Sequence, residues 1–473
     1  MKLFTLIAAL SLTCAAQTSY AARPITDIKL AFDEQRPRQI KVEVKWQAQS
    51  SILHMADWGA EQFPDGWAHF VKDLSVTDTQ NKALIVNFNG KDQWQTSATP
   101  GQQLTLRYTV DMSHDQHAWP HGLDEAAYVK EDAIFSTGQA LFVVPKDAES
   151  FKVSFDLPKT WKSSTPWPKE NHSYKVESYD ALVSNVMMVG RHHEMVFKEG
   201  DFAVTVAVGQ ARRASVPMIE KVMRPAIREY VRLFGGVPKN NYLVTLHEGL
   251  TDGGGFDSSY SLLASEDFHQ GNIIEWGHLV THETLHMWNG TGMHPDANLE
   301  WVKEGFSEYY TFLTLYKLGI IDDQLLSKKF ENHSRRVFAH RDGTALIDTV
   351  KNKQKYWDFM YGGGAIMALV LDHEIRQATS GKKTLENVMH RLFSQYNGKS
   401  FNLEQFIAVV NETAGKDLTP LFQRYVIGKE KPDMKAAFAQ LGFELVPTTT
   451  REIYLIDQAN GKSLRRKWVG LKN

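Results

Sequence analysis

The sequence has almost no cysteine: Cys14 is the only one among 473 residues. A chain with one thiol cannot form an internal disulfide, so it is not one of the small secreted scaffolds that depend on such bonds. Domains of ordinary size fold without them, because their apolar cores are large enough. The lack of cysteine also argues against a structural zinc site, whose fourth ligand is usually Cys or His.

The sequence also lacks an excess of either charge. Lys and Arg number 53 against 55 Asp and Glu. This balance gives no sign of a nucleic-acid partner or of an acidic tail that would bind a charged partner. After the first residues there is no apolar run long enough to cross a membrane, so we expect no membrane span. At about 150 residues per domain, the length predicts two or three domains.

The first 21 residues predict a secretory signal peptide. They contain one lysine, an apolar run from Leu3 to Ala16 and then Ser19-Tyr20-Ala21, a sequence typical of a cleavage site. The run is shorter than the ~20 residues that a membrane anchor needs. We therefore expect an exported protein, periplasmic or secreted. Acylation of Cys14, as in a lipoprotein, is the alternative, but Thr13 is an unusual neighbour for it.

Residues 22–212 predict an N-terminal domain of antiparallel strands, similar to a β-sandwich. Apolar and polar residues alternate there with a period of two, which places one face of each strand in a core. Turn sequences such as Asn89-Gly90 and Thr99-Pro100-Gly101 separate the runs. The alternating apolar positions include Ile40, Val42, Val44, Trp46, Leu104, Leu106, Tyr108, Val110, Phe202, Val204, Val206 and Val208.

Residues 213–430 predict a mostly helical domain, so the fold class is α+β. Apolar residues recur every three or four positions from Ile219 to Phe234, and this helix should end at Gly235-Gly236. Residues 431–473 predict a short extension with one hairpin about Asn460-Gly461. We also expect a strand at 242–246, a glycine-rich turn at 252–257, and helices at 306–317, 324–338, 363–378, 384–396 and 403–413.

The sequence H-E-T-L-H, from His282 to His286, predicts a metal site. On a helix the two histidines lie one turn apart on one face, so both imidazoles reach a single ion. A third ligand is needed, and we expect Glu304, in W-V-K-E-G-F, to supply it from a second helix. A catalytic zinc leaves one position to water, whose proton Glu283 would take as general base. Glu308, one turn after Glu304, would accept the N–H of a ligating histidine.

The same residues allow less specific interpretations. H-E-x-x-H arises by chance in on the order of one per cent of chains of this length, and many such sequences do not lie on a helix. A structural zinc site would need a fourth protein ligand, for which His278 and His294 are near in sequence. His278 shares the helical face of His282, but one further turn places it too far along the axis to share the ion comfortably. A hydrolytic metal site is the interpretation that we favour.

Four segments resemble the glycyl aminopeptidase family of gluzincin metallopeptidases, which is related to the aminopeptidase N group. They are F-G-G-V-P-K-N-N-Y, H-E-T-L-H-M-W-N, W-V-K-E-G-F-S-E-Y-Y and Y-G-G-G-A-I-M-A-L-V-L-D-H-E-I-R, in this order. The resemblance implies an N-terminal β domain and a thermolysin-like catalytic domain, with one zinc ion on the three ligands named above. It also implies that Tyr361 donates its hydroxyl to the tetrahedral oxyanion. Otherwise Tyr361 is an ordinary tyrosine at the start of a helix.

The chain departs from this family in two places. Family members have G-G-L-E-H beside the metal, where the glutamate binds the free amine of the substrate, whereas this chain has Gly254-Gly255-Phe256-Asp257-Ser258. Asp257 is expected to hold the amine with a shorter side chain, and Gly254 and Gly255 to lie beside the substrate backbone. Otherwise Asp257 caps a turn and the exopeptidase preference is altered or lost. Family members often continue into a PDZ domain, for which the residues after 430 are too few.

The sequence thus predicts a zinc metallopeptidase that acts on peptides, most simply an aminopeptidase. A zinc endopeptidase is the alternative if Asp257 does not bind an amine. A catalytically inactive peptide-binding protein is the other, because a glycine-rich strand edge could hold an extended chain without cleaving it. Such a protein would have no need of Glu283.

Overall fold

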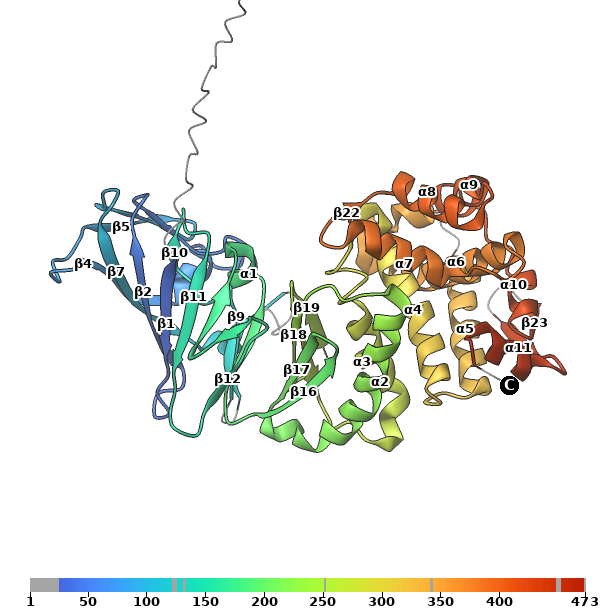
Figure 1. Ribbon diagram of the computed structural model, residues 1–473, viewed down its shortest axis with the longest axis horizontal. Helices are drawn as coiled ribbons and strands as arrows, with labels where there is room; N and C mark the ends of the chain where they lie inside the picture. Colours follow the sequence, from blue (N-terminus) through green and yellow to red (C-terminus); the bar gives the residue numbers. More distant parts are fainter. Residues whose placement is uncertain are drawn as a thin grey trace, which may run out of the picture.

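The structure, a computed structural model, describes residues 25–120, 126–130, 133–250, 252–340, 343–447 and 452–471. The expected signal peptide at residues 1–21, which includes Cys14, lies outside these residues. Strands dominate the N-terminal part of the described chain and helices the C-terminal part (Figure 1). The predicted α+β class is therefore confirmed.

The largest sheet of the N-terminal domain has seven strands. At its centre Val44 lies opposite Leu106 and Val42 opposite Tyr108 in an antiparallel pair. These side chains are buried, as the period of two predicted. The sheet is antiparallel except between β1 and β11, which run parallel. Its order is β13 (Lys169–Glu170), β14 (Ser173–Val176), β11 (Phe151–Asp156), β1 (Thr26–Ala31), β2 (Gln39–Gln47), β7 (Gln103–Asp111) and β4 (Val71–Asp78).

Two four-stranded sheets complete the N-terminal domain. All three sheets contribute to one apolar core, as Val44, Leu53 and Met187 illustrate. One sheet has the order β10 (Val144–Pro145), β3 (Ile52–His54), β6 (Gln93–Thr96) and β5 (Val86–Gly90), and the other β12 (Lys162–Ser164), β15 (Val186–Gly190), β9 (Ala133–Thr137) and β8 (Ala127–Lys130). Short helical turns connect them: η1 (Gly66–Phe70), η2 (His114–Gln116) and α1 (Tyr179–Val183).

A five-stranded sheet lies between the N-terminal domain and the helices (Figure 1). β17 runs parallel to β18, which comes after the expected domain boundary at residue 212. Val204 and Val206 of β17 share a core with Ile219 and Met223 of the first long helix. β16 and β17, which were expected in the first domain, thus belong to the sheet of β18, because a period of two identifies a strand but not its neighbour. The order is β16 (His193–Glu199), β17 (Phe202–Val208), β18 (Asn241–Glu248), β20 (Ser259–Ala264) and β19 (Asp252–Gly255).

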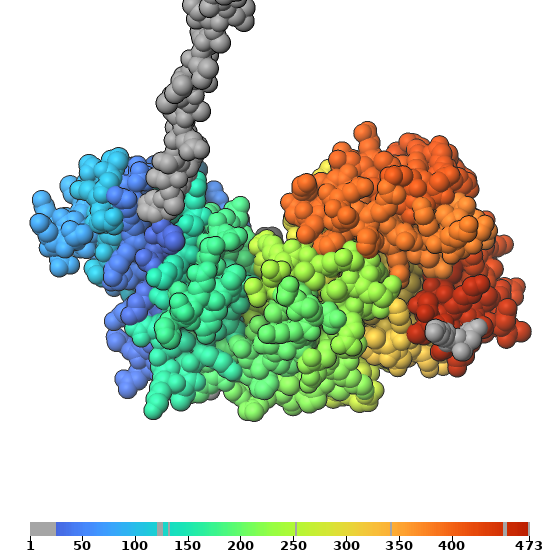
Figure 2. All heavy atoms as spheres, in the orientation of Figure 1, coloured from blue at the N-terminus to red at the C-terminus, as the bar shows by residue number. Residues whose placement is uncertain are grey.

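The glycine-rich segment forms the edge strand of this sheet rather than a turn. β19 pairs antiparallel with β20, with Gly254 opposite Ser261. Among the described strands, none pairs with the outer edge of β19. The surface is indented between the N-terminal domain and the C-terminal helices, next to this sheet (Figure 2). An extended peptide could therefore add to β19 by backbone hydrogen bonds.

The helices of the second domain follow the predicted periods with one large difference. α6 begins at Lys353 rather than at residue 363, because the Asn352 side chain caps its N-terminus, and Tyr361 consequently lies inside the helix. None of the described helices is both long and apolar enough to cross a bilayer. The helices are α2 (Val216–Phe234), α3 (Ile273–Leu285), α4 (Glu300–Lys317), α5 (Asp323–Ala339), α6 (Lys353–Ala378), α7 (Leu385–Tyr396), α8 (Leu403–Ala414), α9 (Thr419–Phe422) and α10 (Lys435–Gln440). Shorter turns are η4 (Gln210–Ser215), η5 (Gln270–Asn272), η6 (Ala297–Leu299), η7 (Leu346–Asn352) and the π-helical η8 (Gln423–Ile427).

The C-terminal residues pack into the second domain, and the hairpin expected about Asn460-Gly461 is wrong. β23 (Phe443–Pro447) pairs with β24 (Ile453–Asp457), whereas Asn460 precedes α11 (Gly461–Trp468). The Asn-Gly pair serves here as a helix start, because Gly461 lies against the backbone of Gly442, where a Cβ would meet its oxygen at 2.5 Å. Trp468 joins the main core and donates its indole N–H to the Tyr309 hydroxyl, 2.9 Å away.

Two glycines allow α4 and α6 to approach closely. A Cβ on Gly305 would lie 2.3 Å from the Cα of Gly364, and a Cβ on Gly364 would lie 2.2 Å from the carbonyl oxygen of Trp301. No real side chain fits these spaces, because the opposing atoms belong to backbone. The glycine contact brings Tyr361 of α6 next to Glu304 of α4, and both are residues of the predicted site.

Gly364→Ala is expected to destabilise the protein by about 2 kcal/mol or more, since the two helices must separate to admit the methyl group. Gly277→Ala in α3 is the matched control, because its nearest neighbours would be side-chain atoms 3.7–3.8 Å away. That variant should be neutral or more stable by less than about 1 kcal/mol. Urea unfolding measures both. Equal midpoints for the two variants would contradict the close packing.

The two domains meet at a small apolar cluster that contains Tyr128, Phe135, Met188, Leu243 and Leu263. His247 of β18 lies in this interface, and its ring meets the Phe135 ring edge-to-face at 4.9 Å. Neither ring nitrogen of His247 has a hydrogen-bond partner among the described residues. Burial, with a smaller effect of His192, lowers the pKa of His247 to about 3.

The low pKa of His247 predicts that the folded protein loses stability in acid. The unfolded chain binds a proton near pH 6.5 and folded His247 only near pH 3, so its contribution to stability is full above pH 6.5 and falls between these values. From pH 7.5 to 5.0 the loss should be about 2 kcal/mol. His247→Leu should lose less stability over this range in urea unfolding, whereas His172→Leu, at an exposed site, should behave like the parent. Identical pH dependence in all three proteins would contradict the assignment.

Candidate active site

α3 carries the H-E-T-L-H sequence and places its histidines on one face, as predicted. His282 is buried in the last turn of α3, and His286 caps its C-terminus. Their Nε2 atoms lie 3.0 Å apart. The Tyr230 hydroxyl of α2 donates to the Thr281 carbonyl over 3.1 Å and fixes this turn against the core. The two imidazoles therefore point at one position.

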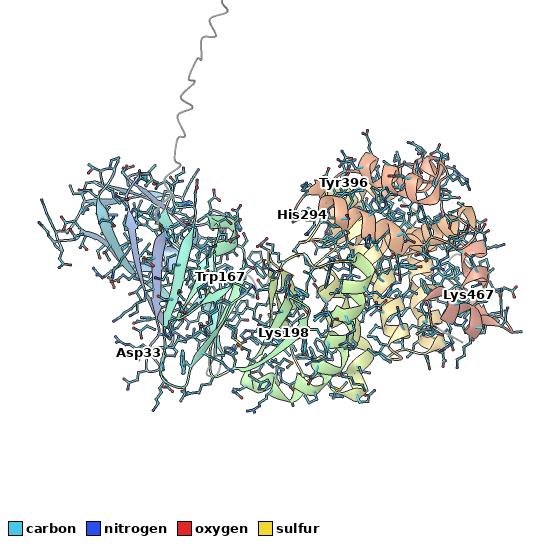
Figure 3. The ribbon with its side chains drawn as sticks, viewed as in Figure 1. Asp33, Trp167, Lys198, His294, Tyr396 and Lys467 are labelled. Atoms are coloured by element: carbon cyan, nitrogen blue, oxygen red, sulfur yellow. The ribbon has the colours of Figure 1, made fainter. Side chains whose placement is uncertain are left out.

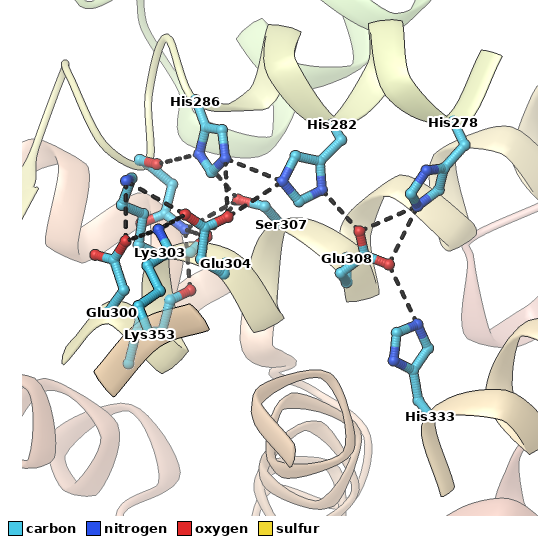
Figure 4. Close-up of polar contacts among 12 residues, drawn as sticks. His278, His282, His286, Glu300, Lys303, Glu304, Ser307, Glu308, His333 and Lys353 are labelled. Atoms are coloured by element: carbon cyan, nitrogen blue, oxygen red, sulfur yellow. Dashed lines mark hydrogen bonds and ion pairs between the residues drawn. The ribbon is translucent and has the colours of Figure 1, made fainter. Parts of the chain in front are cut away.

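α4 brings Glu304 to the same position. Its Oε2 lies 3.4 Å from Nε2 of His282 and 3.3 Å from Nε2 of His286 (Figure 4). In a tetrahedral zinc site with bonds of about 2.0–2.1 Å, ligand atoms lie about 3.3 Å from one another. The three predicted ligands thus form a donor set whose spacing and chemistry fit zinc.

The remaining nitrogen of each histidine is held by another group. Nδ1 of His282 lies 2.9 Å from Oε1 of Glu308, the carboxylate expected in this place. Nδ1 of His286 lies 2.9 Å from the carbonyl oxygen of Asn289. The Asn289 carbonyl accepts a hydrogen bond from Nδ1–H of His286, and the Glu308 carboxylate lies at ion-pair distance from Nδ1 of His282, which leaves Nε2 of each ring to face the metal position. These partners fix the tautomer and the direction of each ring.

Glu308 accepts from more than one histidine. His278 and His333 each approach it through Nε2, at 3.1 and 3.2 Å (Figure 4). Burial alone would raise the pKa of Glu308, but the three histidines hold it well below its usual range. His278, His282 and Glu308 form a second group with metal-ligand spacing. This group would bind a metal through Nδ1 of His282. His278 lies away from His286 and Glu304, as we expected from its position one turn earlier on the helix.

The second oxygen of Glu304 is bound by lysines. Its Oε1 lies 3.3 Å from Nζ of Lys303 and 3.1 Å from Nζ of Lys353, and both ammonium groups also pair with Glu300. Burial opposes the charge of Glu304, but His286, His282 and Lys303 hold its pKa well below the ordinary value. Glu304 is therefore ionised and fixed by its neighbours, with Oε2 toward the metal position.

The metal position opens into a pocket that contains Glu283, Tyr361 and Gly253 of β19. Glu283 lies beside His282 on α3 and faces this space. Another cavity lies on the opposite side of α6, lined by residues such as Phe359 and Met367, and contains none of the predicted site residues. The chemistry is therefore concentrated where α3, α4, α5 and α6 meet the edge strand.

Tyr361 stands over the metal position. Its ring stacks on His282 with centroids 6.0 Å apart and on Trp357 at 4.3 Å. Burial, together with the Glu304 carboxylate to which its hydroxyl hydrogen-bonds, raises the pKa of Tyr361. The hydroxyl therefore keeps its proton and can donate it to an oxyanion. Tyr361 lies inside α6 rather than before it, because this helix begins at Lys353 and not at residue 363.

Asp257 does not lie among the residues that line the pocket. Its Oδ1 forms an ion pair of 2.5 Å with Nζ of Lys239, and its Oδ2 accepts from the Ser258 hydroxyl over 3.0 Å. The carboxylate expected to hold a substrate amine therefore has a cation beside it in this structure. Of the triple glycine, Gly253 reaches the pocket, while Gly254 and Gly255 continue along the edge strand toward Asp257.

His294 has no part in this site. It lies in β21 (His294–Pro295), which pairs with β22 (Ser400–Phe401) near Tyr396 (Figure 3). Several pocket residues were missed by the sequence analysis: His333, Lys329 and Arg336 of α5 and Trp357 of α6. Trp357 precedes Tyr361 by one helical turn and therefore shares its face, a signal that the sequence does contain. The α5 residues had no comparable marker.

Comparisons with known proteins agree with this arrangement. Residues 27–191 match the model of the Peptidase M61 N-terminal domain. The chain is similar to the structure of an aminopeptidase N family protein from Idiomarina loihiensis, with a TM-score of 0.72 and 17% identity over 89% of this chain and 79% of that one. It is also similar to a mutant M1 zinc metallopeptidase from Deinococcus radiodurans bound to a Tyr-Ser-Ala substrate, with a TM-score of 0.56 and 14% identity over 87% of this chain and 95% of that one. No curated protein matches the chain.

At these identities the two structures establish the fold, and the family match identifies residues 27–191 as similar to the N-terminal domain of M61 peptidases. Together they support a metallopeptidase hydrolase. The resemblance to gluzincin peptidases was predicted from motifs of the second domain. The family match in the first domain and the two similar structures confirm it.

Proposed function

We propose that the chain is a zinc-dependent aminopeptidase, which hydrolyses the N-terminal peptide bond of short peptides. The observation that carries this proposal is the convergence of His282, His286 and Glu304 at zinc spacing, beside Glu283 and Tyr361 in one pocket. With the signal peptide expected at residues 1–21, the enzyme would act after export. Each of these residues has a separate task.

Zinc bound at this position would polarise the scissile carbonyl and lower the pKa of a water ligand. Glu283 takes the proton of the attacking water and passes it to the leaving amine. Tyr361 donates its hydroxyl to the oxyanion that develops on the carbonyl oxygen. Glu308 and the Asn289 carbonyl keep the histidine rings in position.

The substrate would lie along the open edge of β19. Glycines at 253–255 let a peptide backbone come close to that of the strand. Trp357 is 47% exposed at the pocket, where its indole can cover the substrate and exclude water from the reacting bond. The amine end would lie toward Asp257, which follows the glycines along the chain and whose carboxylate is shared with Lys239.

An endopeptidase is the second candidate, and the ion pair between Asp257 and Lys239 favours it. A carboxylate that is already neutralised attracts a substrate ammonium less strongly than a free one. Discrimination for a free N-terminus would then be weak, and internal peptide bonds would be cleaved as well.

The test is hydrolysis of aminoacyl reporter substrates and short peptides, each with a free and an acetylated N-terminus. The purified protein is assayed before chelation, after it, and after zinc is restored. We expect cleavage of the free-amine set alone, lost on chelation and recovered with zinc. Cleavage of the acetylated set would indicate the endopeptidase, and zinc-independent cleavage or none would contradict the proposed function.

A further inference from the structure

Lys329 of α5 is a half-buried lysine that lines the catalytic pocket. Within the described chain it has no carboxylate at ion-pair distance, whereas its neighbour Lys328 pairs with Glu331 at 2.8 Å. Its Nζ lies 5.8 Å from the centre of the Phe312 ring. Burial lowers the pKa of Lys329, with Glu308 and Glu275 opposing that effect from a distance and Arg336 adding to it. An ammonium in this state would be stabilised by an anion.

Arg336 follows two helical turns later on the same face of α5 and lines the same pocket. Its guanidinium pairs with Asp358 at 3.2 Å, a carboxylate that is itself 75% exposed and therefore a weak partner. Of the two carboxylates in the pocket, Glu308 is occupied by histidines, and Glu283 follows His282 on α3. Among the described residues, neither cation of the α5 wall thus has a buried carboxylate at ion-pair distance.

The residues that line the pocket indicate where the α5 wall lies relative to the reacting bond. On α3 it includes His278 and Leu279 but not His286, so it extends from the metal position toward the start of that helix. On β19 it includes Gly253, the end of the strand that is farther from Asp257. If the amine end of a substrate lies toward Asp257, as proposed above, the leaving-group end lies toward α5.

We propose that Lys329 and Arg336 form a subsite for a carboxylate on the leaving-group side of the substrate. Peptides carry carboxylates in two places, at the C-terminus and on Asp or Glu side chains, and either would suit this pair. Arg336 can bind a carboxylate through two N–H groups, and Lys329 adds a point charge. The inference rests on the proposed function, since it assigns the part of the peptide that this wall would bind.

The test compares alanine peptides of two, three and four residues as free acids and as C-terminal amides. A third series of amides carries Glu at the second or third residue. We expect kcat/KM at least about tenfold higher for the acid than for the amide at one of these lengths, since hydrogen bonds to charged groups contribute this much. A restored rate for the Glu amides would assign the subsite to side chains as well as to the C-terminus.

Lys329→Gln and Arg336→Gln should each reduce the acid-to-amide ratio several-fold, mainly through KM, and Lys329→Arg should retain it. Lys328→Gln, on the exposed side of the same helix, is the matched control and should keep the parent ratio. Equal rates for acids and amides in the parent, or a ratio unchanged in both Gln variants, would overturn the proposal.

Binding separates this proposal from the proposed function. Calorimetry with the zinc form of Glu283→Gln measures the affinity for each acid and amide without turnover. Tighter binding of the acid, weakened by Lys329→Gln, would support the subsite even if no peptide were hydrolysed. Equal affinity of acids and amides would overturn it even if the enzyme proved to be an active aminopeptidase.

Discussion

Glu283→Gln is expected to lower kcat for peptide hydrolysis by about a thousandfold while zinc remains bound at one ion per chain. The amide fills the same space but cannot accept a proton, so the attacking water loses its general base and the leaving amine loses its proton donor. The ligands His282, His286 and Glu304 are unchanged, so metal affinity should stay near the parent value. Steady-state kinetics and zinc analysis on the same preparation measure both quantities.

Glu275→Gln is the control for this variant. Glu275 lies in the first turn of the same helix, is exposed, and stands outside the pocket. It should hydrolyse peptides at the parent rate and unfold at the parent temperature. Turnover by Glu283→Gln at the parent rate would show that another group activates the water, and the proposed role of Glu283 would be wrong.

Tyr361→Phe is expected to reduce kcat by about a hundredfold with a much smaller change in KM. The lost hydroxyl is a donor to the oxyanion, which exists in the transition state and not in the bound substrate. Burial and the neighbouring Glu304 carboxylate raise the pKa of Tyr361, so it acts as a donor throughout the neutral range. The pH profile of kcat near neutrality should therefore have the same shape in the variant as in the parent.

Tyr356→Phe provides the comparison on the same helix. The Tyr356 hydroxyl accepts from Lys355 at 2.7 Å, and Tyr356 is not part of the catalytic pocket. It should leave kcat unchanged. An equal loss in both variants would indicate that α6 had been disturbed, and no loss in Tyr361→Phe would remove the tyrosine from the mechanism.

The three candidate metal ligands could be brought together from the sequence because their geometry is local. His282 and His286 depend only on the spacing of one helical turn, and a second helix starting near Trp301 was enough to suggest Glu304. The position of Glu308 followed from the same turn of α4. These features require no knowledge of how distant segments pack.

The sequence was least informative where distant segments meet. Folding brings Lys239 from eighteen positions earlier to the Asp257 carboxylate, an ion pair that no motif marks. Phe202 to Val208 looked like part of the first domain, yet this strand lies beside β18 of the second. Lys329 and Arg336 had no motif to mark them, because their significance comes from the pocket that they share with α3 and α6.

The motifs gave no family signal for the N-terminal domain, for a related reason. Alternating strands are common to many β domains, so their pattern alone identifies no family and marks no catalytic residue. The family match nevertheless falls on residues 27–191. Motifs concentrated in the active site thus pointed to the fold of the second domain, while the family match lies in the first.

The central claim is that one zinc ion binds between His282, His286 and Glu304. Anomalous X-ray scattering, recorded on both sides of the zinc absorption edge from crystals containing zinc, tests it most directly. We predict a single zinc peak between Nε2 of the two histidines and the Glu304 carboxylate. A peak between His278, His282 and Glu308 instead, or no peak at either position, would contradict the claim.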